Sequence, residues 1–163
     1  MSRALRIITL AILAVLASMP SVPAADGVPV AAMPYRRADF DFKYAWRTAQ
    51  VERGLAVDGL LKNVRYANVE DVVLTVSLLN GEGKLLADET VFPIPQQIRM
   101  DDDRPFGLVL KNVVLSPGDL LRFQIRYRVD EGDTSSFTWL GSFTVDATTG
   151  QAPTEKVKPA GSW

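Results

Sequence analysis

The chain has 163 residues, with 18 lysines and arginines against 19 aspartates and glutamates, and it contains neither cysteine nor histidine. The lack of cysteine excludes disulfides, thiolate nucleophiles and the lipid-bearing cysteine of a lipoprotein. The lack of histidine excludes Ser-His-Asp triads and imidazole metal sites. The charge balance shows no basic excess, so we expect no nucleic-acid partner. Binding and carboxylate chemistry remain open.

The first 24 residues have the organisation of a secretory signal peptide. Arg3 and Arg6 precede an apolar run, 7–17, which we expect to be helical, and small residues follow up to Ala24. The run has about 11 residues and a transmembrane helix needs about 20, so we expect cleavage after Ala24 and no membrane anchor afterwards. We expect the product to be soluble after cleavage and either periplasmic or secreted. A bacterial periplasm is favoured, because an exported domain without disulfides depends on its core alone.

The remaining sequence divides into one domain between two tails. Residues 25–38 are small residues and prolines without a period, so we expect a flexible tether. Residues 147–163 are rich in Thr, Gly, Pro and Lys, which predicts a disordered C-terminal tail. Residues 39–146 alternate apolar and polar positions, as β-strands do, and their number suits one domain.

The alternation predicts an all-β domain, an immunoglobulin-like sandwich of two antiparallel sheets with about seven strands. The turn sequences 80–84 and 116–119 separate neighbouring strands, whereas 93–104, with two prolines and an acidic run, is expected to be a long loop or a crossover between sheets. The expected strands are 40–46, 55–61, 72–79, 85–91, 106–110, 121–129 and 137–145.

The first of these strands places four aromatic side chains on one face. They are Phe40, Phe42, Tyr44 and Trp46. A row of rings can stack on sugars, but aromatic side chains are chiefly a means of burying apolar area. We therefore expect this row to cover the core of the sandwich.

Residues 57–86 carry a G-x-[hydrophobic]-x-N pattern at 59–63 (GLLKN), a strand that ends at 76–80 (VSLLN), and a glycine-rich hairpin. This stretch resembles the bacterial exported immunoglobulin-like domains called FxLYD, with Val, Leu and Asn in place of Phe, Tyr and Asp of the name-giving motif. The segment 115–118 (LSPG) with the following strand is similar to the L-x-P-G turn of that family. The resemblance implies the sandwich fold and no activity.

Asp101, Asp102 and Asp103 are the candidate metal ligands, because carboxylate oxygens are the ligands that calcium prefers. Together with the acidic turn 130–133 they could supply several oxygens. The spacing is not that of an EF-hand, and three consecutive aspartates in an extended backbone cannot all face one ion, so a solvated acidic loop is favoured.

Arg122, Arg126 and Arg128, the arginine row, share one face of a predicted strand and are the candidate residues for binding a partner. They could meet an acidic glycan or an acidic partner strand. Pairing with acids on neighbouring strands is the default expectation.

The sequence therefore predicts an exported, non-catalytic envelope protein, a structural or protein-interaction module that binds through a sheet face or an exposed edge strand. We assign no catalytic residue and no cofactor. The alternative is a calcium- or carbohydrate-binding sandwich that uses the 93–104 loop. Alternation defines faces but not neighbours, so strand order, the exposed edge, the partner and the oligomeric state stay open.

Overall fold

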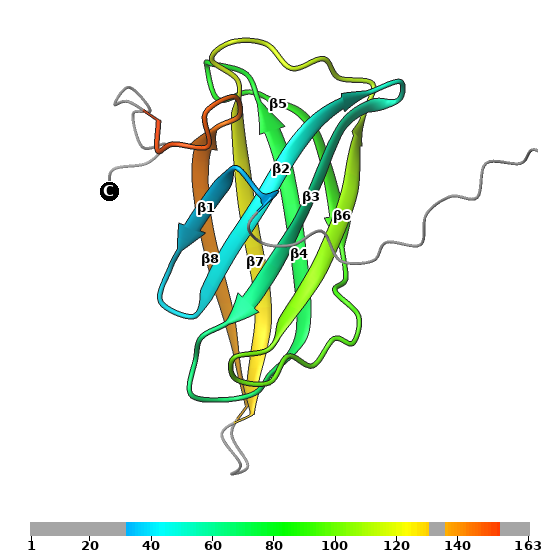
Figure 1. Ribbon diagram of the computed structural model, residues 1–163. Coiled ribbons are helices and arrows are strands. Elements are labelled where there is room, and N and C mark those ends of the chain that lie inside the picture. Colours follow the sequence, from blue (N-terminus) through cyan, green and yellow to red (C-terminus); the bar gives the residue numbers. More distant parts are fainter. Residues whose placement is uncertain (1–31, 131–135, 154–163) are drawn as a thin grey trace, which may run out of the picture.

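The computed structural model describes residues 32–130 and 136–153 and has eight strands in two four-stranded antiparallel sheets (Figure 1). The first sheet has the order β1-β2-β3-β6 and the second has the order β5-β4-β7-β8. The strands are β1 (Tyr35–Ala38), β2 (Phe42–Val51), β3 (Gly54–Asn63), β4 (Val69–Leu79), β5 (Leu85–Val91), β6 (Asp103–Lys111), β7 (Leu120–Asp130) and β8 (Ser136–Asp146). The predicted two-sheet sandwich is confirmed, with one strand more than expected. The predicted signal peptide lies outside the described residues.

The core is built from the inward positions of the alternating strands. Trp46 of β2 is fully buried and packs against Phe123 of β7, with ring centroids 5.0 Å apart, and Phe123 stacks on Phe143 of β8 at 4.9 Å. Each such side chain contributes about 1.5–3 kcal/mol when it is fully buried. The aromatic row of β2 therefore covers the core, as expected, with one exception. Phe40 is 89% exposed, because it lies in the turn that the Asp39 carboxylate caps at the amide of Phe42.

The tether prediction for 25–38 is wrong at its end, because Tyr35–Ala38 form β1 beside β2. Tyr35 packs on Trp46 with ring centroids 5.7 Å apart, and its hydroxyl donates to the carbonyl of Thr148. The start of the predicted C-terminal tail is likewise an ordered turn, capped by Asp146, with Ala147 buried. These contacts join segments far apart in the sequence, and a local pattern of apolar and polar residues cannot predict them. Residues 25–31 and 154–163 lie outside the described residues.

The segment 92–102 crosses from β5 in the second sheet to β6 in the first, so the predicted crossover is confirmed, except that β6 already begins at Asp103. Ile98, fully buried, fixes this segment through a backbone bridge to Val69. The side-chain amide of Asn63 donates to the carbonyls of Ala67 and Ile98. The crossover is thus tied to the body of the domain.

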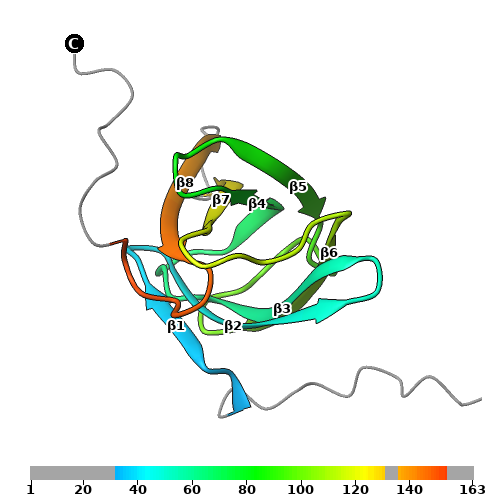
Figure 2. The ribbon, with the colours of Figure 1, turned by 90° about the horizontal axis from the view of Figure 1, so that it is seen from above.

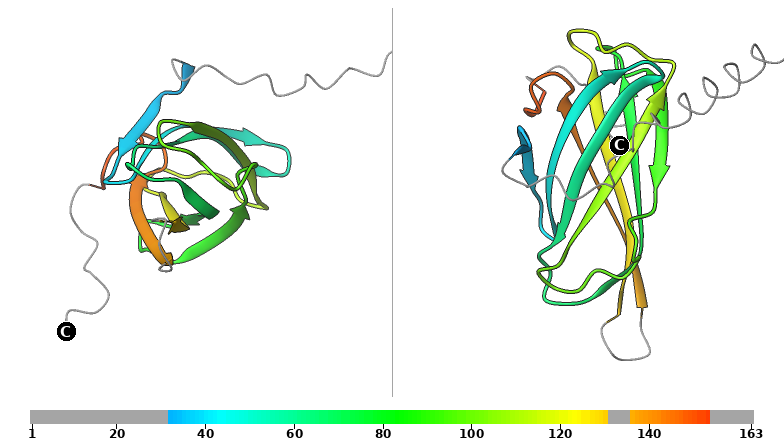
Figure 3. Two further views of the ribbon diagram at one scale, coloured as in Figure 1. Left: turned by 90° about the horizontal axis from the view of Figure 1, so that it is seen from below. Right: turned by 45° about the vertical axis from the view of Figure 1, so that its right-hand side comes forward.

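The two sides of the sandwich differ. β5 and β6 lie side by side and close one side, whereas β1 and β8 are the edge strands of the other side (Figures 2 and 3). β1 is hydrogen-bonded only to β2, and β8 only to β7. β5 and β6 are likewise hydrogen-bonded to one strand each, but they lie beside one another, so β1 and β8 are the edge strands without a strand of the other sheet close by.

Candidate functional site

The arginine row lies on the outer face of the second sheet, where the alternation of β7 was expected to place it. Arg128 is paired with Glu70 at 2.8 Å and with Asp71 at 3.2 Å. Arg122 and Arg126 have no carboxylate partner among the described residues, and the Nε of Arg122 is buried without a hydrogen-bond partner there. Cross-strand charge pairing therefore accounts for one member of the row and leaves two cations available on this face.

Two shallow hollows of about 310 and 340 Å³ lie on the same outer face, and both are lined by Arg126 and Val73. Leu140 of β8, 73% exposed, borders one of them, and Phe92, 51% exposed, borders the other. The face thus combines cations with exposed apolar groups, and arginine is one of the residue types enriched in protein interfaces.

The β8 edge, the side of β8 that faces away from β7, differs from the other three sheet edges. β1 has four residues and carries Arg36 and Arg37. β5 and β6 carry two and three charged residues respectively, and β6 also contains a proline. β8 has eleven residues, pairs with β7 over its whole length, and carries no charge before Asp146 and no proline. Short length, charges and proline are the devices by which proteins prevent edge strands from pairing with other chains, and β8 lacks them.

Aromatic side chains and arginines line the inner side of the β8 edge. Trp139 of β8 is 43% exposed, and the guanidinium of Arg65 lies 4.8 Å above its ring. The guanidinium of Arg37, on β1, lies 4.9 Å above the ring of Phe143. A strand added to β8 would therefore meet stacked cation–aromatic pairs on one of its faces.

A buried polar cluster, which we call the inter-sheet cluster, consists of Asp41, Arg65 and Tyr127 and lies near Trp139, since Arg65 contacts that ring as well. Arg65 donates to the carboxylate of Asp41 at 3.1 Å, and the hydroxyl of Tyr127 on β7 also donates to that carboxylate. Burial, and then the hydrogen bond to Asp41, raise the pKa of Tyr127 well above the usual value, and burial raises the pKa of Tyr44 in the same direction. Both hydroxyls therefore stay protonated at neutral pH. Because Asp41 directly precedes β2 of the first sheet and Tyr127 lies on β7 of the second, their hydrogen bond links the two sheets.

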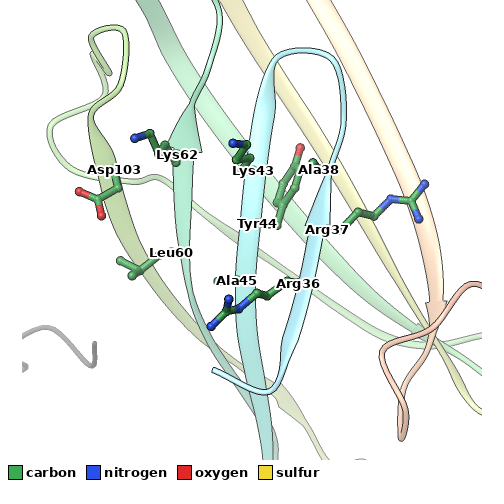
Figure 4. A pocket seen from close by; sticks show the side chains of 9 residues that line it. All are labelled: Arg36, Arg37, Ala38, Lys43, Tyr44, Ala45, Leu60, Lys62 and Asp103. Carbon is green, nitrogen blue, oxygen red and sulfur yellow. The ribbon is translucent and has the colours of Figure 1, made fainter. Parts of the chain in front are cut away.

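A basic hollow of about 390 Å³ opens on the outer face of the first sheet, between β1 and β3 (Figure 4). Arg36, Lys43 and Lys62 border it, its floor contains Ala45 and Leu60, and Asp103 is its one acid. Arg37 also lines it, but its side chain extends toward β8. Lys62 is held by Asp101 at 3.3 Å. The hollow could hold an anionic group, and its cations lie on exposed strand positions.

The structure does not bring Asp101, Asp102 and Asp103 together. Asp101 pairs with Lys62, Asp102 pairs with Arg104 at 3.3 Å, and Asp103 borders the basic hollow. In the part of the chain that the structure describes, no group of three or more acidic side chains is placed to hold a metal ion. The same part contains no helix with the length and hydropathy that membrane spanning requires.

Sequence reasoning missed the β8 edge and the inter-sheet cluster. The available signal for the edge was the uncharged run 136–145, which the alternation assigned to a strand without showing whether it was central or peripheral. The cluster joins positions 24 and 86 residues apart, and no local pattern connects them.

No protein-family description and no curated protein matches this chain. Among solved structures, the GAE domain of yeast GGA1 is similar at 12% identity and a TM-score of 0.39, over 68% of this chain and 98% of that one. The GAE domain of GGA2p from Saccharomyces cerevisiae is similar at 6% identity and a TM-score of 0.40, over 69% and 96%. A β-glucuronidase of Bacteroides uniformis is similar at 19% identity and a TM-score of 0.32, over 66% of this chain and 15% of the enzyme. Similarity at this level says nothing of what the chain binds, and the resemblance to FxLYD domains stays a prediction.

Proposed function

We propose that this protein is a non-catalytic interaction module that acts in the bacterial envelope after export and binds another protein through the β8 edge. The envelope location rests on the signal peptide predicted for residues 1–24. The observation that carries the binding role is the β8 edge itself, an eleven-residue edge strand without an internal charge or a proline.

Strand addition explains how such an edge binds. Alternate residues of an edge strand point their backbone N–H and C=O groups away from the sheet, and an extended segment of another chain can pair with them. Backbone hydrogen bonds then give affinity, and the side chains on the two faces give specificity. On β8 the outward side chains include the exposed Leu140, and the inner ones include the half-exposed Trp139.

The test is capture of a partner by cross-linking in the periplasm, with lysines used to block one edge at a time. We expect one recurrent partner to be enriched with the wild-type protein and lost when Leu140→Lys and Ser142→Lys are combined, because lysines on an edge strand oppose pairing. Leu86→Lys is the matched control, since Leu86 is 44% exposed on β5, the opposite edge strand of the same sheet. A partner that survives the β8 substitutions, or that is lost equally with Leu86→Lys, contradicts binding at β8.

A further inference from the structure

Positive groups flank the β8 edge on both faces. On the inner face, Arg37 and Arg65 lie above the rings of Phe143 and Trp139. On the outer face, Arg122 is the neighbour of Thr144 and Arg126 is the neighbour of Leu140 in the register of β7 with β8. Arg122 and Arg126 therefore lie one strand in from the edge.

In the part of the chain that the structure describes, three of these four guanidiniums have no carboxylate partner. Among residues 32–130 and 136–153, no ion pair joins an acid to Arg37, Arg122 or Arg126, whereas Arg65 is paired with Asp41. Arg122 also has the buried Nε without a partner, and a buried unpaired donor of this kind costs free energy until an acceptor reaches it. The side chains of β8 are thus uncharged up to Val145, while guanidiniums without a carboxylate partner among the described residues lie on both faces of the edge.

The distances suit side chains on an added strand. Neighbouring strands lie about 4.8 Å apart, so a strand added to β8 would lie roughly 9.6 Å from β7. On the outer face, the side chain of Arg126 or Arg122 and that of a glutamate on the added strand together span this distance, passing over Leu140 or Thr144 of β8. On the inner face, a carboxylate of the added strand beside Phe143 would approach the guanidinium of Arg37. Charge-assisted hydrogen bonds between guanidinium and carboxylate groups are stronger than neutral ones.

We propose that the β8 edge accepts an extended segment of another protein that carries carboxylate side chains on both faces. This inference rests on the proposed function and adds the chemistry of the partner. The β8 strand of a second copy is disfavoured, because it would bring the same arginines against their equivalents. The acidic strand β5 of a second copy is disfavoured because it lies against β6 on the closed side of the sandwich.

The test uses the exported, isotope-labelled protein and three synthetic peptides of eleven residues. In each peptide the variable residue, which is Glu, Ser or Lys, occupies two pairs of adjacent positions and so lies on both faces of the strand, and Val and Thr fill the other positions. We measure amide hydrogen exchange of β8 and the dissociation constants at low and high salt. We expect the Glu peptide to protect β8 amides and to bind at least tenfold more tightly than the Lys peptide, with the difference shrinking as salt rises.

Variants separate the charge from the edge. Arg126→Glu should reduce the preference for the Glu peptide at least threefold, whereas Arg53→Glu, an exposed site in the β2–β3 turn, should leave the preference unchanged. If the Ser or Lys peptide protects β8 as well as the Glu peptide does, the inference about charge is overturned and the proposed function stands. If no peptide protects β8, strand addition at this edge is overturned as well. If the protein dimerises in sedimentation with its β8 amides protected, the occupant is a second copy and the inference is overturned.

Discussion

The inter-sheet cluster makes a quantitative prediction about stability. Tyr127→Phe removes the hydroxyl that donates to the carboxylate of Asp41, and both residues are almost fully buried, at 4% and 7% exposed. A hydrogen bond to a charged group contributes about 1.5–3 kcal/mol, so we expect this substitution to lower the free energy of unfolding by that amount.

Asp41→Asn tests the ion pair of the same cluster. Loss of one partner of a buried pair costs about 3–5 kcal/mol. The side chain of Arg65 is 16% exposed and therefore partly hydrated, so we expect the lower part of this range, about 3–4 kcal/mol. Since the two substitutions act on one carboxylate, the double variant should lose less than the sum of the single losses, with a coupling of about 1 kcal/mol or more.

The assay is urea unfolding at neutral pH, followed by tryptophan fluorescence, because Trp46 is fully buried. Tyr66→Phe is the matched control, since Tyr66 is 95% exposed and its hydroxyl should contribute less than about 0.5 kcal/mol. A Tyr127→Phe variant as stable as Tyr66→Phe, or strictly additive effects of the two cluster substitutions, would refute the assignment of the cluster as a link between the sheets.

Alkaline pH should destabilise the fold in a way that depends on Tyr44 and Tyr127, whose pKa values are raised by burial above the unfolded value near 10. The free energy of unfolding should be independent of these tyrosines below that pH and should fall by roughly 1.4 kcal/mol per pH unit for each tyrosine above it. Urea midpoints between about pH 9 and 11.5 measure this slope, and Tyr127→Phe should remove the contribution of one tyrosine. A slope that Tyr127→Phe leaves unchanged would show that the alkaline loss of stability has another origin than this buried hydroxyl. Gly59→Ala should destabilise by about 1–3 kcal/mol, because a Cβ there would lie 2.6 Å from the backbone carbonyl oxygen of Ala45 and 2.3 Å from the ring of Phe106. Urea unfolding checks this, and a loss under about 0.5 kcal/mol is the contrary result. Melting temperatures in chelator and in millimolar calcium should coincide, since the carboxylates of residues 101–103 diverge; a calcium-dependent rise that Asn substitutions abolish would restore the alternative calcium site.

Alternation predicted the faces of the sandwich well, because the side-chain period of a strand is a local property. The pattern in β7 placed Phe123 inward and Arg122 outward, as the structure has them. Alternation could not predict β1, whose order depends on the contact of Tyr35 with Trp46 and on its hydrogen bond to the segment after β8. Four residues with two arginines carry too little apolar pattern to indicate a strand.

The candidate sites were predictable only in part, for a related reason. The arginine row is a local pattern, but which arginine finds an acid depends on register, and Arg128 reaches Glu70 and Asp71 at an irregularity in the pairing of β4 with β7. The sequence therefore predicted the arginine row, but it could not predict that Arg122 and Arg126 have no acidic partner among the described residues. Likewise, an uncharged strand becomes a binding edge only if it lies at the margin of a sheet, which is a property of strand order.

The difference between the two sides of the sandwich also sets how many partners the domain can hold. On the closed side β5 lies against β6, and on the open side β8 is the long edge strand. If the neighbouring β6 prevents strand addition at β5, the second sheet extends at β8 alone, and the complex has a stoichiometry of one to one. The domain would then act as a terminal receptor for one segment and not as a link in a growing polymer.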